Sequence, residues 1–307
     1  MIDFIKLVIY PSKEVCVEYV QIDRYGYYYQ FPYEKVYIRI DKENPRVEIR
    51  FSPMYCMQGH NVSFDRQVFI DSINLLSEAL QIDLWQASVE ILEFGVVMEV
   101  PQRPAEYIIR HHAKAEERLI ENEKKNDKGC FRYWEDKDVS LKMYDVGKNL
   151  KNKVAKSIRN QIAGYNADLH YIKFEIHYKR PHRVLNNGHE ILLTDLLTAQ
   201  WESLLKEDLY IQYQRLYFTG GLLPPQSVKE ISSIDLLLRK YISDGIAAGK
   251  SIAELKKEVY ESFKYCSILS PEKRKSRQCQ YRKAEKKLKL DKAGYDLTDY
   301  INSVLQQ

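Results

Sequence analysis

The spacing of apolar residues switches between two periods along the first 219 residues, and this alternation limits the folds open to the chain. Residues 1–58 contain short runs with a period of two, which is typical of β-strands. Residues 63–81 change to helical spacing, and residues 88–100 form a long strand-like run that ends at Pro101. We therefore expect an α+β fold with an antiparallel sheet, helices packed on one side of it, and an order of elements that fits two similar halves.

The alternation continues further along the chain. The elements predicted there are a helix over 104–124, a hairpin over 131–134 and 139–144, a strand over 170–178 and a helix over 194–205. After a Gly-Gly-Leu-Leu-Pro-Pro run at 220–225, only helical spacing is present. We therefore predict an α+β domain over 1–219 and a helical, basic C-terminal region over 226–307.

Positive charge is concentrated in that C-terminal region. The whole chain has 47 Lys and Arg against 43 Asp and Glu, a net charge of only +4. Ten of the basic residues but only two acids lie between Lys273 and Lys292. A block of this kind can bind phosphates, and the alternative is a solvated helix end.

Three features argue against a secreted or membrane protein. The five cysteines form no CxxC pair, which excludes a zinc ribbon and favours a reducing compartment. The first ten residues lack the pattern of a signal peptide. No apolar run approaches the ~18–20 residues that cross a bilayer. We expect a cytoplasmic protein with no membrane partner.

Since the P-loop, GxGxxG, HExxH and GxSxG motifs are absent, the candidate site residues are polar side chains inside strands. In the run 170–178, Glu175 and His177 lie on the same strand face. Glu93 lies in an apolar run beside Gly95, and Gly allows close backbone approach. If these two strands are neighbours, Glu93, Glu175 and His177 converge and offer ligands for a divalent ion. The alternative is a polar sheet face in contact with water.

Tyrosine is abundant, with 24 residues, and two tyrosines lie in the predicted hairpin. These are Tyr133 and Tyr144. A tyrosine phenolate can attack phosphorus if a metal and nearby cations lower its pKa from ~10. Composition does not rank the tyrosines, because each of them can equally serve in packing.

Several short segments resemble replication-initiation proteins of bacterial mobile elements. Residues 91–101 (ILEFGVVMEVP) look like a family strand "LEFGVN", and residues 141–148 (LKMYDVGK) resemble "LKxYDKGK". Residues 171–176 (YIKFEI) resemble "LRFEI", and residues 52–61 fit a family loop that ends in Gly and Asn. These segments follow the family's order and span roughly residues 45–215. The group is similar to the rolling-circle initiators of plasmids and filamentous phages.

The resemblance implies a pseudo-symmetric α+β fold that nicks one DNA strand with a tyrosine and a divalent metal. It implies metal ligands at Glu93 and Glu175. Tyr133 is the candidate nucleophile, and Tyr144 is the reserve. The lysines implied near the scissile phosphate are Lys142 and Lys148.

The leading hypothesis is therefore a DNA-binding replication initiator, an endonuclease that nicks its plasmid or phage origin and forms a phosphotyrosine link. Its partner is single-stranded or supercoiled origin DNA, and its cofactor is Mg²⁺ or Mn²⁺. Two alternatives stay open, a non-enzymatic DNA-binding protein on the same scaffold and a protein–protein adaptor. A homodimer is also left open. The residues expected to bind nucleic acid are Lys148, Lys151, Lys153, Arg274, Lys275, Arg277, Arg282 and Lys286.

Overall fold

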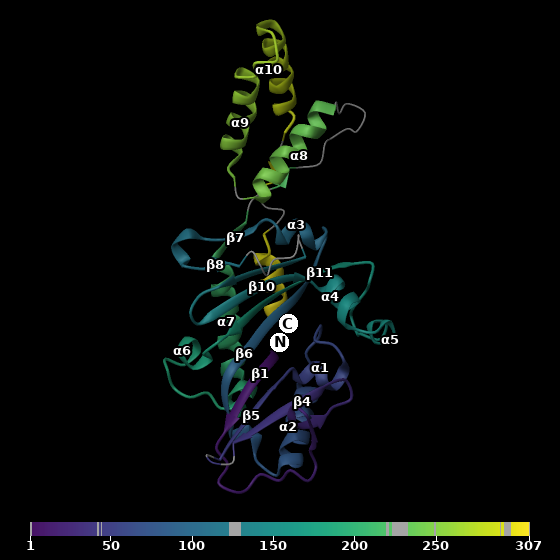
Figure 1. The fold of residues 1–307 in the computed structure, drawn as a ribbon, viewed down its shortest axis with the longest axis vertical. Helices are drawn as coiled ribbons and strands as arrows, with labels where there is room; N and C mark the ends of the chain where they lie inside the picture. Colours follow the sequence, from purple (N-terminus) through teal and green to yellow (C-terminus); the bar gives the residue numbers. More distant parts are fainter. Residues whose placement is uncertain are drawn as a thin grey trace. The chain divides into compact units, whose positions relative to one another are not determined.

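The computed structural model divides the chain into two compact units (Figure 1). It describes residues 2–41, 43, 45–122, 130–218, 221–222, 233–248, 250–288, 290–291 and 296–306. The first unit, which we call the sheet unit, comprises Met1–Ala105, Ala113–Arg215 and Thr298–Gln307. The second, the helical unit, comprises Glu106–His112 and Leu216–Leu297.

A single sheet of ten described strands organises the sheet unit, and every pairing between them is antiparallel. The strand order is β2-β3-β4-β5-β1-β6-β11-β10-β9-β8. The strands are β1 (Ile2–Ile9), β2 (Gln21–Asp23), β3 (Gly26–Gln30), β4 (Lys35–Asp41), β5 (Arg46–Phe51), β6 (Ser88–Val100), β8 (Ile120–Glu121), β9 (Phe131–Glu135), β10 (Val139–Asp145) and β11 (His170–Tyr178). This architecture confirms the predicted α+β class.

The strand order repeats itself about the central pair β1 and β6. On one side of the pair the order outward is β5-β4-β3-β2, and on the other side it is β11-β10-β9-β8. In each half the last of these strands in the chain leads into helices, and the second half has two further helices between β10 and β11. The helices of the first half are α1 (Pro53–Gln58), α2 (Arg66–Leu80) and η1 (Leu84–Gln86); those of the second are α4 (Val146–Lys153), α5 (Lys156–Arg159), α6 (Pro181–Leu185), η3 (Leu193–Leu197) and α7 (Ala199–Gln214). The two halves are therefore topologically equivalent.

The two faces of the sheet differ in chemistry because side chains alternate along each strand. On one face of β11, the Phe174 ring packs edge-on against Tyr213 of α7, with ring centroids 5.5 Å apart. The last helix, α11 (Thr298–Leu305), packs against β6 and α7 (Figure 1). The opposite face of β11 carries Lys173, Glu175 and His177. We call this second surface of the sheet the polar face.

The register between β6 and β11 depends on Gly95. Glu175 pairs with Gly95, and His177 pairs with Glu93, so the two strands are neighbours as predicted. A Cβ atom on Gly95 would lie 2.7 Å from the Phe174 carbonyl oxygen and 3.0 Å from the Glu175 Cα. Backbone atoms at these distances cannot rotate away, so only glycine allows this approach.

Replacing Gly95 by Ala is expected to lower the free energy of unfolding by about 1–3 kcal/mol, because β11 must shift away from β6. Urea unfolding followed by tryptophan fluorescence would measure the loss in the sheet unit, which holds all three tryptophans. Gly147→Ala is the matched control, since a Cβ at that position meets no atom closer than 3.4 Å. Equal stabilities of the two variants would contradict the prediction.

Three long helices and two short pairs of strands make up most of the described helical unit. They are α8 (Ser233–Ala247), α9 (Ile252–Lys264), α10 (Pro271–Glu285), β7 (His111–Ala113) paired with β12 (Leu216–Phe218), and β13 (Gly221–Leu222) paired with β14 (Leu290–Asp291). Ser251 caps α9, and Glu254 completes the capping box. The three helices bury one apolar cluster that includes Ile242, Leu255 and Tyr281.

Two features of the chain's organisation differ from the sequence-based expectation. The helix predicted over 104–124 is instead α3 (Pro104–Ile108), β7, η2 (Ala115–Glu117) and β8, because strand pairing overrides helical spacing there; residues 123–124 lie outside the described residues. The helical C-terminal region does not run to the chain end, because α11 belongs to the sheet unit. Most of the expected boundary at 220–225, and residue 226 itself, lie outside the described residues.

Candidate functional site

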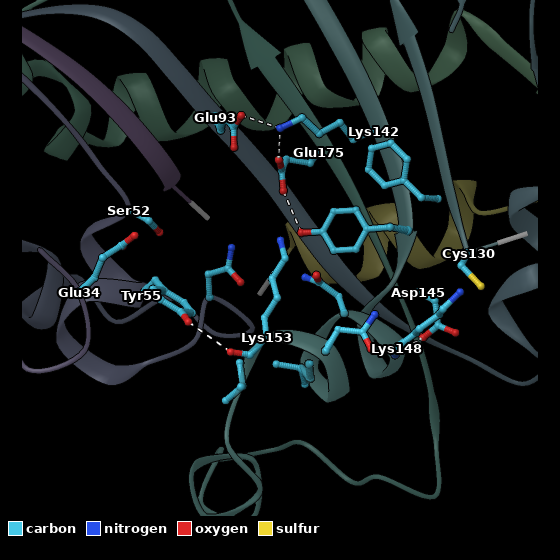
Figure 2. A pocket seen from close by; sticks show the side chains of 17 residues that line it. Glu34, Ser52, Tyr55, Glu93, Cys130, Lys142, Asp145, Lys148, Lys153 and Glu175 are labelled. Atoms are coloured by element: carbon cyan, nitrogen blue, oxygen red, sulfur yellow. Dashed lines mark hydrogen bonds and ion pairs between the residues drawn. The ribbon is translucent and has the colours of Figure 1, made fainter. Parts of the chain in front are cut away.

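A cavity of 690 Å³ opens on the polar face of the sheet unit, between the second half and α1 with its neighbouring loops (Figure 2). Its lining comes from β6, β10, β11, α1, α4 and neighbouring loops, all within the sheet unit. The charged and phenolic side chains in the lining are Glu34, Tyr55, Glu93, Lys142, Tyr144, Asp145, Lys148, Lys153 and Glu175. This is the one place in the described chain where the predicted carboxylates, a predicted tyrosine and the predicted lysines lie together.

Lys142 bridges the two carboxylates of the cavity. Its Nζ lies 2.5 Å from Glu93 Oε1 and 2.9 Å from Glu175 Oε1 (Figure 2). The Tyr144 hydroxyl donates to Glu175 Oε2 at 3.0 Å, and His177 Nδ1 lies 2.6 Å from Glu93 Oε1. The antiparallel registers of β6, β11 and β10 bring these five side chains from three adjacent strands into one cluster.

A second lysine continues this network into the core. Lys173 is only 1% exposed, and its ammonium group forms an ion pair with Asp3 on β1. The same Nζ donates to the Asn61 carbonyl oxygen at 3.0 Å and lies 3.7 Å from Glu175 Oε2. Glu175 therefore lies between two ammonium groups.

These charges set the protonation states of the cluster. Burial alone would raise the pKa of Glu175, but the ammonium groups of Lys142 and Lys173 outweigh it and hold that pKa well below its usual range. Burial and the charge of Glu175 raise the pKa of the Tyr144 phenol well above its ordinary value. Burial raises the pKa of Asp3 to about 7, against the opposing effect of Lys173. At neutral pH, Glu175 is thus ionised and Tyr144 is a neutral donor.

The candidate nucleophile Tyr133 lies beside the cluster. It is the register partner of Lys142, and it is 8% exposed. Its hydroxyl donates to Ser140 Oγ at 2.8 Å and lies 3.4 Å from Glu135 Oε2. Tyr133 is not one of the described residues that line the cavity, whereas Tyr144 is. Access to the cavity therefore favours Tyr144 over Tyr133 as the group that meets a substrate.

The donor chemistry suits the divalent metal that the resemblance implies, but the arrangement does not. The Lys142 ammonium group occupies the position between the two carboxylates, and His177 is directed at Glu93 rather than at a shared centre. Within the described ranges, no group of three His, Cys, Asp or Glu side chains is arranged to hold a metal ion. As arranged here, Glu93, Glu175 and His177 do not fit a metal, and the lysine supplies the positive charge.

The basic residues expected to bind nucleic acid fall into two groups. Lys148 and Lys153 on α4 line the cavity, and Lys151 is exposed on the same helix. The other group belongs to the helical unit. On α10 and its C-cap, Lys275, Arg277, Arg282 and Lys286 are exposed, and Arg274 is half-buried with its Nε bound to the Leu269 carbonyl.

Sequence reasoning missed Asp3 and the pairing role of Lys173. The available signal was a charged residue inside the apolar run at 2–9. A buried carboxylate needs a cationic partner. Which residue is that partner depends on the order of the strands, because Lys173 lies on β11, the strand on the far side of β6 from β1.

No protein-family model matches the chain, and no curated protein matches it in sequence. Among the described residues, no helix combines the length and apolar character needed to span a bilayer. The resemblance to replication initiators therefore stays a prediction from short motifs.

Proposed function

We propose that the chain is a DNA-binding replication initiator of a mobile element, and that it nicks one DNA strand with a tyrosine. The observation that carries this proposal is the gathering of Tyr144, Glu175 and Lys142 in one accessible cavity. A nucleophile, a proton acceptor and a cation for phosphate are the groups that attack on a phosphodiester requires.

The geometry supports Tyr144 as the nucleophile. Its oxygen would bond to phosphorus, the bond from phosphorus to the 3′ oxygen would break, and that oxygen would take a proton from solvent. Because the pKa of Tyr144 is raised, its proton must leave during the attack, and Glu175 Oε2 at 3.0 Å is placed to accept it. Lys142 is placed to stabilise the phosphate charge that develops, and as it moves toward the phosphate Glu175 becomes a stronger base.

The exposed cations on α10 support a DNA partner for the helical unit. Phosphate contacts by Lys and Arg release counterions, so such binding weakens steeply with salt. The lysines of α4 line the cavity, where they would bind the phosphates of the DNA strand to be cut. A divalent metal is not needed for any of these roles, and whether one takes part stays a prediction for the experiment below.

The second candidate is a non-enzymatic DNA-binding protein on the same scaffold. The Lys142 bridge favours it, because both carboxylates already have a cationic partner and the tyrosine is not activated. In that case Glu93 and Glu175 stabilise the sheet.

Incubation with supercoiled plasmid and single-stranded oligonucleotides from its own replicon, with Mg²⁺, Mn²⁺ or EDTA, tests the proposal. We expect a nick and a protein–DNA adduct on a denaturing gel for the wild type and Tyr133→Phe, and neither product for Tyr144→Phe. Loss in Tyr133→Phe instead would make Tyr133 the nucleophile, and loss in EDTA would support the metal. DNA binding without cleavage in every condition would favour the second candidate. If the protein neither binds nor cleaves DNA, the protein–protein adaptor remains as the alternative.

A further inference from the structure

The first half of the sheet carries a different surface at the place equivalent to the cavity. In the repeated strand order, β3, β4 and β5 hold the positions that β9, β10 and β11 hold around the Tyr144 cluster. Where the second half has its cluster, the first half presents tyrosines and arginines on the polar face and in the β2–β3 turn. They line a hollow of 790 Å³ that includes Tyr25, Tyr37, Arg39 and Arg50.

The aromatic rings of this hollow are unusually accessible. Tyr25 is 68% exposed and Tyr37 is 39% exposed, and their rings meet edge-on with centroids 6.1 Å apart. The Tyr28 ring packs behind Tyr37 at 5.9 Å. Asp23 holds the turn in place, because it accepts from the Tyr25 backbone N–H at 2.8 Å and from the Tyr37 hydroxyl at 3.1 Å. Asp23 therefore fixes the backbone of the turn at Tyr25 and the hydroxyl end of the Tyr37 side chain.

Cations lie beside these rings. The Arg24 guanidinium lies over the Tyr25 ring, 4.6 Å from its centroid, and Lys35 Nζ lies 4.1 Å from the centroid of Tyr28. Arg39 is exposed, and neither Arg24 nor Arg39 has a carboxylate partner among the residues that the structure describes. Exposed rings can stack on bases, and guanidinium groups without a carboxylate partner can bind phosphates.

We propose that this surface of β2–β5 binds single-stranded DNA by stacking bases on Tyr25 and Tyr37 while Arg24 and Arg39 contact phosphates. The inference rests on the proposed function in one respect, that the partner is DNA. Glu34 lines both this hollow and the cavity, so the two sites are neighbours on one face. The surface would hold a stretch of the strand that enters the cavity. Duplex DNA fits it poorly, because paired and stacked bases cannot lie on the rings.

Fluorescence anisotropy with a labelled dT20 oligonucleotide and a duplex of equal length tests this site. We expect Tyr25→Ala/Tyr37→Ala to weaken dT20 binding by at least about tenfold and to leave duplex binding unchanged. Tyr25→Phe/Tyr37→Phe is expected to bind dT20 like the wild type, because the rings remain while the Asp23 hydrogen bond is lost. Tyr10→Ala removes another exposed tyrosine of the sheet unit and should have no effect.

The outcomes separate this site from the nicking proposal. Unchanged dT20 binding by the double alanine variant would overturn the site, even if the wild type nicks DNA. Equal losses for the alanine and phenylalanine variants would also overturn it, because the hydrogen bond rather than stacking would then matter. A wild type that binds dT20 but never cleaves would refute the nicking proposal alone, and the site would stand if the alanine variant lost binding. A wild type with no DNA affinity would overturn both.

Discussion

Replacing Lys173 by Met is expected to lower the free energy of unfolding of the sheet unit by about 3–5 kcal/mol, the cost of leaving one member of a buried ion pair without its partner. Lys173 is almost fully buried. Its ammonium group pairs with Asp3, donates to the Asn61 carbonyl oxygen and lies 3.7 Å from Glu175 Oε2. Methionine fills much of the same volume, so lost packing would contribute little. Urea unfolding followed by tryptophan fluorescence measures the change.

The loss should grow with pH. The pKa of Asp3 is already raised to about 7 by burial, and removal of Lys173 takes away the main interaction that lowers it. A carboxyl group whose folded pKa lies above its unfolded value loses stability as pH rises from the unfolded pKa to the folded pKa. Wild type and variant should therefore weaken together up to about pH 7, and only the variant should keep weakening above it. Unfolding curves of both proteins between about pH 6 and pH 9 would show the difference between them widening above about pH 7.

Two comparisons test the cause of that loss. Asp3→Asn/Lys173→Met removes both charges and should recover part of the stability lost in Lys173→Met. Lys179→Met is the matched control, because Lys179 directly follows the same strand, is about one-third exposed and pairs with Glu135 at 3.3 Å. Exposed pairs of this kind contribute about 0–1 kcal/mol. If Lys173→Met costs no more than Lys179→Met, the buried network does not support the sheet.

Replacing Lys142 by Met is expected to open a metal site at the position that the Lys142 ammonium group occupies in the wild type. The change removes the ammonium group between Glu93 and Glu175 and leaves two facing carboxylates with His177 beside them. Mn²⁺ should then bind and stabilise the variant, by about 2.7 kcal/mol at a concentration one hundred times Kd. A melting curve with Mn²⁺ and then with excess EDTA would show a reversible rise in Tm for the variant alone.

Lys153→Met provides the control for this experiment. Lys153 lines the same cavity but has no ion-pair partner within the described part of the chain, so its removal should not alter the response to Mn²⁺. An equal rise in Tm for the wild type would mean that a divalent ion displaces Lys142 by itself, which would restore the metal predicted from sequence. No rise in either protein would show that the carboxylates hold no metal at all.

Local patterns predicted much of what lies within a single element. The long strand-like run at 88–100 predicted β6, and the period of two in 170–178 predicted β11 and placed Glu175 and His177 on one face. Gly95 correctly indicated a close approach between strands. These features are encoded locally, because alternation of side chains and the absence of a Cβ act at the residue itself.

The cluster at the cavity depends on contacts between distant segments. Lys142 meets Glu93 and Glu175 only because β10, β11 and β6 pair in one register, and a shift of one residue would turn these side chains to the other face. The same register places Tyr144, rather than Tyr133, in the cavity. Likewise, the helical spacing after residue 225 predicted helices in that region but not the packing of α11 on β6.

The amino-acid sequence by itself thus determined the α+β class, the long strands with their polar and apolar faces, and the basic α10. Only the tertiary structure decided that a lysine bridges the two carboxylates, that Asp3 and Lys173 form a buried pair, and that tyrosines and arginines of β2–β5 share a surface. The physical reason is that periodicity depends on neighbours in the chain, whereas the partner of a buried charge depends on strand order and register, which the packing of the whole sheet determines.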